Sequence, residues 1–194
     1  MMMKCKCGSY AINLSRHGRD GTDTESCDVC FWRNKALHNT RRDAMIARPL
    51  YIFDLDGTLA LIDHRRHLVE GRHKDWKVFY AACSEDAPNL PVLSIVRALH
   101  ELGADIWIFS GRSDEVWDET AAWLSQHMAF TFWSLTMRVE GDYTPDEALK
   151  RKWLHAMSEE DRARLVAVFD DRDKVVKMWR DEGVPCFQVA KGEF

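Results

Sequence analysis

The sequence predicts an α/β fold with a mainly parallel sheet, helices on both of its faces, and a small N-terminal appendage. From residue 50 onward, short apolar runs alternate with segments of helical apolar spacing, a pattern typical of βαβ units. Polar residues directly follow several of the apolar runs, where the carboxyl ends of parallel strands bind ligands. The length of 194 residues, 46% of them hydrophobic, suits one compact domain with a short extra segment.

The short apolar runs predict five strands, at residues 50–53, 104–111, 130–137, 164–171 and 185–190. Apolar residues at helical spacing predict four helices, at residues 91–103, 113–127, 144–157 and 173–183. Gly103 is expected to end the first helix, because glycine readily adopts the left-handed conformation at a helix C-terminus. Thr144 is expected as the N-cap of the third helix, with Pro145 as its first residue.

Residues 1–32 are interpreted as a separate zinc ribbon and residues 33–49 as a basic linker, ahead of a domain at residues 50–194. Two close pairs of cysteines lie in the first segment: Cys5, Cys7, Cys27 and Cys30. Four thiolates in tetrahedral reach are a typical structural Zn²⁺ site, and so short a segment has little core of its own. Unrelated free thiols, or His17 in place of one ligand, are the alternatives.

The net charge of −4 is unevenly distributed along the chain. Residues 1–49 hold nine Lys/Arg against five Asp/Glu, whereas residues 50–194 hold 18 against 26. A basic appendage is a weak indication of a polyanionic partner, and ordinary solvated charge explains it equally well. No apolar run approaches the ~20 residues needed to span a bilayer, and the start lacks the apolar core of a secretory signal. A cytoplasmic protein is therefore expected.

Acidic, basic and hydroxyl residues occupy the expected strand ends. The strand at residues 50–53 is followed by Asp54 and Asp56, and the fourth strand ends at Asp170 and Asp171. Because adjacent carboxylates repel unless a cation joins them, and a few oxygen ligands suit Mg²⁺, these positions predict a magnesium site. Gly57 permits a sharp turn, in which backbone N–H groups are expected to receive a phosphate oxygen.

Two further strand ends contribute polar groups. Ser110, Gly111 and Arg112 end the second strand, and Asp146 and Lys150 lie in the first turns of the third helix. Each residue alone has an ordinary explanation as a turn former or an N-cap. A calcium loop is disfavoured for "DLDG", because its glycine comes too early and apolar residues follow. The joint pattern at one edge of the sheet indicates chemistry.

These residues resemble the motifs of the haloacid dehalogenase (HAD) superfamily of phosphotransferases. The first motif is "FDLDGT", the second is Ser110, the third is the Lys150 region and the fourth is "DD" at residues 170–171. The stretches "FSGR", "GDYTPDEALK" and "FDDRDKVVKMWRDEGVPCFQVAKGEF" are similar to the 3′-phosphatase domain of bacteriophage polynucleotide kinase-phosphatase. The resemblance covers residues 50–194 and implies a three-layer Rossmann-like HAD fold. It does not cover the cysteine segment.

The resemblance implies a role for each aspartate at the strand ends. Asp54 is implied to be the nucleophile that forms an aspartyl-phosphate, and Asp56 the general acid and base. Mg²⁺ is implied to be held by Asp54, the Asp56 carbonyl, and the pair Asp170 and Asp171, one of which binds through water. The metal would neutralise charge on the phosphoryl oxygens.

The other motif residues are implied to bind the phosphoryl group. Ser110 would donate a hydrogen bond to it, and Lys150 would stabilise its charge. Asp146, one helical turn before Lys150, would orient that lysine. Lys152 is a rival for the same role, and Lys150 is preferred on its spacing from "GD".

Residues 59–90 separate the first strand from the first core helix and are interpreted as a small helical cap. By the resemblance, Arg65 in this cap, together with Gly111 and Arg112, would bind substrate; a surface charge is the alternative for Arg65. Three aromatic residues at helical spacing are expected to pack against the body, with base stacking as the alternative: Trp76, Phe79 and Tyr80.

The sequence therefore predicts a magnesium-dependent phosphomonoesterase that acts through an aspartyl-phosphate, with nucleic-acid 3′-phosphate ends as the leading substrate. A nucleotidase or small-molecule phosphatase is the alternative. A nucleic-acid-binding adaptor that uses the zinc ribbon is the hypothesis from a different class. A phage-encoded protein of this kind would act in the host cytoplasm.

Overall fold

A computed structural model describes residues 48–128, 130 and 134–192, together with four two-residue strands nearer the N-terminus. Contacts between Cα atoms divide the chain into residues 1–47 and 48–194. In the first unit, β1 (Met3–Lys4) pairs antiparallel with β2 (Tyr10–Ala11), and β3 (Ser15–Arg16) pairs antiparallel with β4 (Glu25–Ser26). The predicted zinc ligands Cys5, Cys7, Cys27 and Cys30 lie outside the described residues, so the zinc site stays a prediction.

The second unit is built on a five-stranded sheet in the order β11-β10-β5-β8-β9. Every neighbouring pair in this sheet is parallel, which confirms the predicted α/β class. Its strands are β5 (Leu50–Phe53), β8 (Asp105–Ser113), β9 (Ser134–Arg138), β10 (Leu165–Arg172) and β11 (Cys186–Gly192). The chain moves outward from β5 through β8 to β9, then returns to β10 on the other side. A ligand site is expected where the order reverses, beside β5 and β10.

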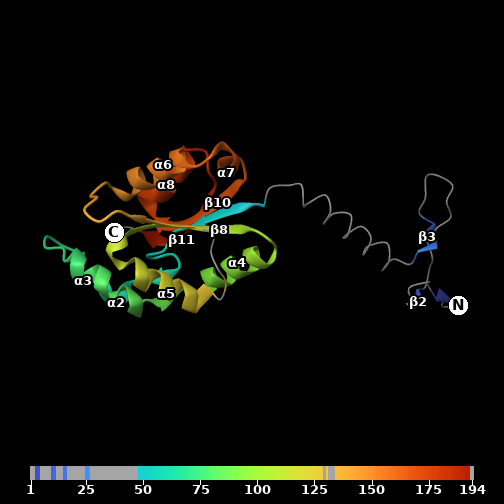
Figure 1. Cartoon of the computed structure of the whole chain (residues 1–194), viewed down its shortest axis with the longest axis horizontal. Coiled ribbons are helices and arrows are strands. Elements are labelled where there is room, and N and C mark those ends of the chain that lie inside the picture. Colours follow the sequence, from blue (N-terminus) through green and yellow to red (C-terminus); the bar gives the residue numbers. More distant parts are fainter. Residues whose placement is uncertain are drawn as a thin grey trace. The chain divides into compact units, whose positions relative to one another are not determined.

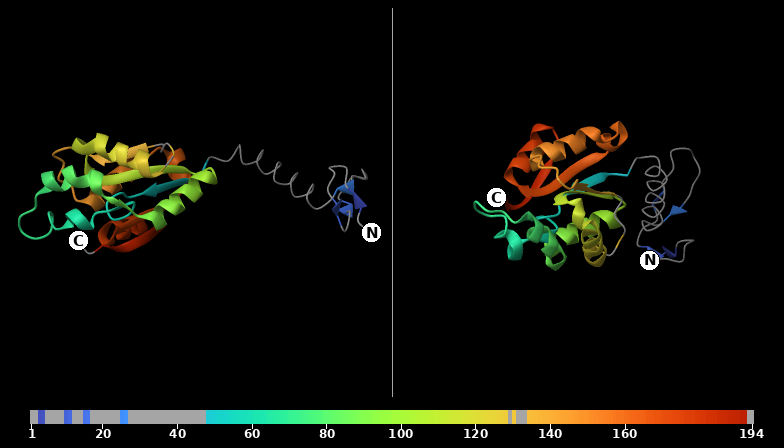
Figure 2. Two further views of the ribbon diagram at one scale, coloured as in Figure 1. Left: turned by 90° about the horizontal axis from the view of Figure 1, so that it is seen from below. Right: turned by 60° about the vertical axis from the view of Figure 1, so that its left-hand side comes forward.

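Helices cover both faces of this sheet and give a three-layer arrangement (Figure 1). On one face lie α4 (Leu90–Glu101), the 3₁₀ turn η2 (Asp114–Val116) and α5 (Trp117–Met128). The other face carries α6 (Asp146–Ala156), α7 (Glu159–Ala163) and α8 (Asp173–Asp181). The right-hand view of Figure 2 keeps the strands between these groups of helices.

Alternation along the buried strands sorts their side chains into two cores. Phe53 and Phe169 belong to the core beneath α4 and α5, where their rings stack 4.5 Å apart. Their neighbours Ile52 and Val168 point the opposite way, into the core beneath α6 and α8 that surrounds Trp179. Because successive strand residues face opposite sides, a strand covered on both faces is apolar throughout.

The cap is an insertion closed by a short antiparallel pair of strands. β6 (Ala60–Leu61) pairs with β7 (Ala87–Pro88) at its base. Between them lie α2 (Asp63–Arg66), α3 (Trp76–Ala81) and the 3₁₀ turn η1 (Ala82–Glu85). The carboxylate of Asp75 accepts a hydrogen bond from the Val78 amide at 3.1 Å and caps α3.

The structure differs from the expected elements at several ends. Pro145 is the N-cap of α6, with an extended ψ of 142°, and the helix begins one residue later than expected. The amide of Thr144, expected as the cap, donates instead to the Asp142 carboxylate at 2.8 Å. The helix α7 was not predicted, because five residues are too few for a visible apolar period. In contrast, Gly103 does end α4, with a φ of 89° directly after the C-cap Leu102.

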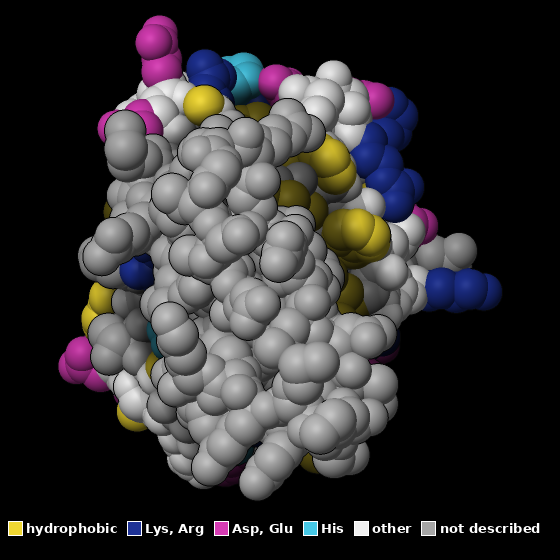
Figure 3. Space-filling view, turned by 90° about the vertical axis from the view of Figure 1, so that its right-hand side faces the viewer, with side chains coloured by type: hydrophobic (Ala, Val, Ile, Leu, Met, Phe, Trp, Pro, Cys, Tyr) yellow, Lys and Arg dark blue, Asp and Glu magenta, His cyan; other side chains and the backbone are white. Residues whose placement is uncertain are grey.

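The described surface is mixed in character. No helix in the described part of the chain combines the length and apolar character needed to cross a membrane. On the face shown in Figure 3, the described side chains that are visible include hydrophobic, basic and acidic groups side by side.

Gly192 at the end of β11 generates a prediction about stability. A Cβ atom there would lie 2.2 Å from the backbone oxygen of Asp171 and 2.4 Å from the Cα of Arg172. Backbone atoms cannot rotate away, so Gly192→Ala is expected to destabilise the domain by about 1–3 kcal/mol. Thermal and urea denaturation would measure this, with the exposed neighbour Lys191→Ala as the control. Equal stability of the two variants would contradict the close approach of β11 to β10.

Candidate active site

Asp54 and Asp56 follow β5 directly, as expected, but their side chains have different partners. The backbone N–H of Asp54 donates to the Phe169 carbonyl at 2.9 Å, which ties this residue to the adjacent strand β10. Its buried carboxylate accepts from the Lys150 ammonium at 2.5 Å. The carboxylate of Asp56 instead contacts the guanidinium groups of Arg65 and Arg112. The two carboxylates are therefore prepared for different tasks.

Gly57 allows the chain to turn beside the end of β10. Its φ is 91°, and a Cβ atom would lie only 2.2 Å from the Asp171 carboxylate. The expectation that amides of this turn receive a phosphate oxygen is wrong for three of them. The N–H groups of Gly57, Thr58 and Leu59 donate to the carbonyls of Ala60 and Leu55 within the turn.

Three buried carboxylates converge at the carboxyl ends of β5 and β10. Oxygens of Asp54, Asp170 and Asp171 all lie within 4.8 Å of one another. The ammonium of Lys150, which reaches in from α6, lies 2.7 Å from Asp170 and 2.5 Å from Asp54. Lys152, the rival for this position, is exposed.

The charges in this cluster are incompletely balanced. Burial raises the pKa of Asp54 well above its ordinary value. The Lys150 charge lowers this pKa, and repulsion from Asp170 and Asp171 offsets part of that effect. Burial and the Asp170 charge likewise raise the pKa of Asp171 to about 7. Burial alone would lower the pKa of Lys150, but Asp170 and Asp54 raise it, so the lysine stays charged. Three carboxylates and one ammonium leave a net negative charge that a divalent cation would neutralise.

The donor set of the cluster fits Mg²⁺. All three side chains supply hard oxygen atoms, and neither histidine nor cysteine takes part among the described residues. Magnesium prefers one or two carboxylates with water and phosphate oxygens, whereas Zn²⁺ selects nitrogen and sulfur ligands. The Thr58 hydroxyl, 3.4 Å from Asp171, holds one oxygen of that carboxylate.

Ser110 and Arg112 lie in β8, the strand that pairs with β5. The strand runs on to Ser113, past the expected end at residue 111. The Ser110 hydroxyl is fully buried and accepts from the Arg112 amide at 3.2 Å. Gly111 is needed at this point, because a Cβ atom would lie 2.7 Å from the Asp146 carboxylate.

Asp146 does not contact Lys150 as expected. Its carboxylate bonds with Arg138, from β9, and with Arg172, from the end of β10. Arg138 also donates to the carbonyls of Gly111 and Thr144 at 2.8 and 2.6 Å. Asp146 therefore joins the ends of β9 and β10, and Arg138 links them to β8. Lys150 is oriented by the carboxylates of the cluster instead. Sequence reasoning missed Arg138, whose only signal was its place at the end of a strand.

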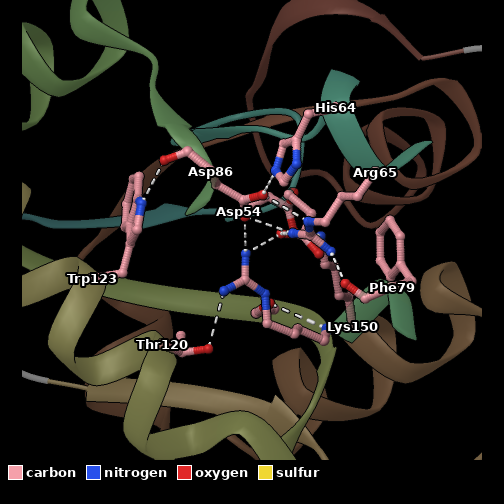
Figure 4. A network of polar contacts seen from close by, with 11 residues as sticks. Asp54, His64, Arg65, Phe79, Asp86, Thr120, Trp123 and Lys150 are labelled. Carbon is pink, nitrogen blue, oxygen red and sulfur yellow. Dashed lines mark hydrogen bonds and ion pairs between the residues drawn. The ribbon is translucent and has the colours of Figure 1, made fainter. Parts of the chain in front are cut away.

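A second network joins the cap to the core around Asp86, which sequence reasoning also missed (Figure 4). This buried carboxylate accepts from Arg65 Nε and Nη2, each at 2.6 Å, and from Arg112 at 2.8 Å. His64 lies 2.9 Å away, and the Trp123 indole donates to the Asp86 carbonyl at 2.8 Å. A lone aspartate before a helix gave no signal beyond that of a turn former.

The network fixes the charge of Asp56. Burial alone would raise the pKa of Asp56, but the guanidinium groups of Arg112 and Arg65 outweigh it and hold the pKa below its ordinary value. Both predicted phosphate-binding arginines are engaged with carboxylates here. Arg65 is also buried and lies 4.0 Å over the Phe79 ring, so it is not a surface charge.

A cleft of about 1120 Å³ opens above these groups. Asp54, Asp56, Gly111 and Arg112 lie at its base. One wall comes from the cap helices α2 and α3. The other comes from the loop between β9 and α6 and from residues 172–175, at the end of β10 and the start of α8. The base of the cleft is thus where the predicted nucleophile becomes accessible.

Residues 48–194 match the family model of the polynucleotide kinase PNKP phosphatase domain. A protein of Autographa californica nuclear polyhedrosis virus, described as a bifunctional polynucleotide kinase/RNA ligase, is 32% identical over 140 residues. That match spans 71% of this chain and 19% of the viral protein. A chain of the Pnkp1/Rnl/Hen1 RNA repair complex is 30% identical, with a TM-score of 0.64.

The chain spans less than half of the repair-complex chain, with 77% of this chain and 45% of that one aligned. The class C acid phosphatase from Bacillus anthracis aligns over 83% of this chain and 73% of its own, with a TM-score of 0.55. At 13% sequence identity, the similarity to this acid phosphatase concerns the fold alone. The family match covers the sheet, the cap and every group of the acidic cluster, and the chain therefore belongs to the HAD phosphatases of the polynucleotide kinase PNKP phosphatase domain family.

Proposed function

We propose that the protein is a magnesium-dependent phosphomonoesterase that works through an aspartyl-phosphate and removes 3′-phosphates from polynucleotide ends. The observation that carries the proposal is the pairing of Asp54 with Lys150, Asp170 and Asp171 at the base of an open cleft. Membership of the phosphatase family supports the reaction type. The names of two matched relatives, a polynucleotide kinase/RNA ligase and a chain of an RNA repair complex, support the substrate class.

In the first half of the proposed reaction, an Asp54 oxygen attacks phosphorus as the bond to the ester oxygen breaks. The carboxylate becomes an acyl phosphate, and Asp56 gives a proton to the departing hydroxyl group. In the second half, water attacks the same phosphorus while Asp56 takes its proton. The Asp54–phosphorus bond breaks, so inorganic phosphate leaves and the carboxylate is restored.

The residues around Asp54 supply the electrostatics of this reaction. Lys150 holds Asp54 by a hydrogen bond and places a positive charge beside the phosphoryl oxygens. The Ser110 hydroxyl lies in the neighbouring strand and would donate to one of those oxygens. Asp54, Asp170 and Asp171, with the Asp56 carbonyl, would hold Mg²⁺. Either Asp170 or Asp171 would bind it through water. The metal, when bound, neutralises phosphoryl charge so that a carboxylate can approach.

Asp56 must gain and lose a proton in turn. Held by Arg112 and Arg65, it is ionised at rest, which suits its task as the base toward water. An incoming phosphate dianion places negative charge beside it, and like charge raises the pKa of a carboxyl group. Substrate binding thus favours the protonated form that the first half of the reaction needs.

The substrate proposal predicts an order of preference. The wild-type protein with Mg²⁺ is expected to release phosphate from 3′-phosphorylated oligonucleotides faster than from 5′-phosphorylated oligonucleotides or mononucleotides. The longer substrate gains binding energy along the cleft that a small ester lacks. Phosphate release from these substrates and from p-nitrophenyl phosphate, measured side by side, tests this. A preference for mononucleotides would replace the proposal with a nucleotidase.

Replacement of the proposed nucleophile Asp54 is expected to cause a complete loss of turnover. Asp54→Asn is expected to abolish hydrolysis of every phosphomonoester, because an amide cannot accept the phosphoryl group. Asp181→Asn is the matched control, since this exposed residue of α8 pairs with Lys177 one turn away in the same helix. Steady-state rates and acid-quench trapping of labelled protein would be measured. Residual turnover in Asp54→Asn above that of a blank would rule out this mechanism.

The charge imbalance predicts how Mg²⁺ and stability are linked. Mg²⁺ is expected to stabilise the wild-type protein by roughly 1.4 kcal/mol at about ten times its Kd. Asp171→Asn is expected to raise the thermal midpoint without metal, because the ionised carboxylate is disfavoured where burial and Asp170 raise its pKa. The same variant should gain less from Mg²⁺.

Thermal denaturation before and after Mg²⁺ addition measures both effects, with Asp181→Asn as the control. An undiminished gain from Mg²⁺ in Asp171→Asn would remove Asp171 from the proposed site.

A further inference from the structure

The three aromatic residues at helical spacing on α3 divide into two roles. Phe79 is buried, and its ring lies under the guanidinium of Arg65 at 4.0 Å. Trp76 is 42% exposed and lines the cleft. Its ring is nearly parallel to that of Tyr80, with centroids 5.8 Å apart and an interplanar angle of 27°. Packing against the body therefore explains Phe79 but not the open surface of Trp76.

The cleft is much larger than the reacting group requires. Its volume of about 1120 Å³ exceeds the roughly 300–1,000 Å³ of typical small-molecule pockets. A phosphoryl group at Asp54 would fill only its base. The remaining space reaches along α2 and α3 as far as Lys74 and Trp76. A substrate with at least a nucleoside beyond the phosphate is needed to occupy it.

The two walls of the cleft differ in charge. The cap wall carries three cations, Arg66, Lys74 and Lys77, against one carboxylate, Glu70. The lining opposite carries three cations, Arg138, Arg172 and Lys174, but they are outnumbered by carboxylates that would repel a polyanion: Glu115, Glu140, Asp142, Asp146, Glu147 and Asp173. A phosphodiester backbone in the cleft is therefore guided along the cap wall, where the exposed tryptophan lies.

Aromatic and basic groups are combined at one point of the cap wall. The Lys74 ammonium lies 5.5 Å from the centroid of the Trp76 ring, and Lys77 follows Trp76 in the same helix. Aromatic faces next to cations are how proteins bind single-stranded nucleic acid, with the ring stacking on a base and the cation near a phosphate.

We propose that Trp76 is the base-stacking platform of the substrate site and that Lys74 and Lys77 bind the adjoining phosphates. The proposal rests on the function proposed above and defines the substrate more narrowly. Unpaired bases fit this site best, because bases inside a duplex are stacked on both faces and only the outer face of the terminal pair is open. The site therefore selects single-stranded or frayed ends with bases in the last two nucleotides.

Trp76→Ala separates base recognition from chemistry. Two 3′-phosphorylated oligonucleotides are compared, one with normal bases and one with abasic residues at its last two positions. For the wild type, kcat/KM is expected to be higher on the base-bearing substrate. Trp76→Ala should reduce that ratio by about 5- to 150-fold, the effect of losing one base–aromatic stack. Trp76→Phe should restore most of the ratio.

The ratio is insensitive to a general folding defect, which would lower both rates together. Trp117→Ala is the matched control, because Trp117 is equally exposed at 42% but lies outside the cleft. An unchanged ratio in Trp76→Ala, with normal hydrolysis of 3′-phosphorylated ends, overturns this inference alone. A wild type that hydrolyses p-nitrophenyl phosphate but not 3′-phosphorylated ends overturns the proposed substrate, and this inference with it.

The cations provide an independent measurement. Lys77→Gln is expected to reduce the slope of log(kcat/KM) against log[salt] on the base-bearing substrate by about one phosphate contact. Lys177→Gln is the control, since this exposed lysine of α8 pairs with Asp181 and lies outside the cleft. Identical slopes in both variants would show that the backbone does not follow the cap wall.

Discussion

The repulsion among three buried carboxylates is the constraint on which the rest of the site depends. Asp54, Asp170 and Asp171 meet because the strands β5 and β10 are parallel neighbours. Lys150 offsets part of their charge from α6, a helix that the chain forms only after crossing the sheet. With three carboxylates and one ammonium the cluster is two positive charges short, which is the charge that a divalent cation would supply in the proposed phosphoryl transfer.

A second electrostatic centre, Asp86, connects the cap to this cluster. By holding both Arg65 and Arg112, it fixes the groups that in turn hold the Asp56 carboxylate. Asp86 comes from the end of the cap insertion, and Arg112 from a core strand. The cap is thus more than a cover over the cleft, because its position determines the environment of the proposed acid and base.

The same cap divides its side chains between packing and the proposed recognition of the substrate. Phe79 packs beneath Arg65, whereas Trp76, one helical turn earlier, remains open to the cleft. A small cap leaves the cleft accessible at its walls, which suits an extended substrate better than a fully enclosed one. Because the cap wall is basic and the opposite wall is acidic, a negatively charged chain in the cleft would lie along the cap wall.

The sequence by itself determined the fold class, the succession of the main strands along the chain and the residues at their ends. Alternating apolar runs and helical spacing are local signals, and "FDLDGT" and the paired aspartates at residues 170–171 identify strand ends. Only the tertiary structure decided that Lys150 contacts Asp54 and Asp170 instead of Asp146, and that Asp86 joins Arg65 to Arg112. These pairings join residues 20 to 96 positions apart. Coulomb attraction between side chains depends on their separation in space, which no local pattern in the chain records.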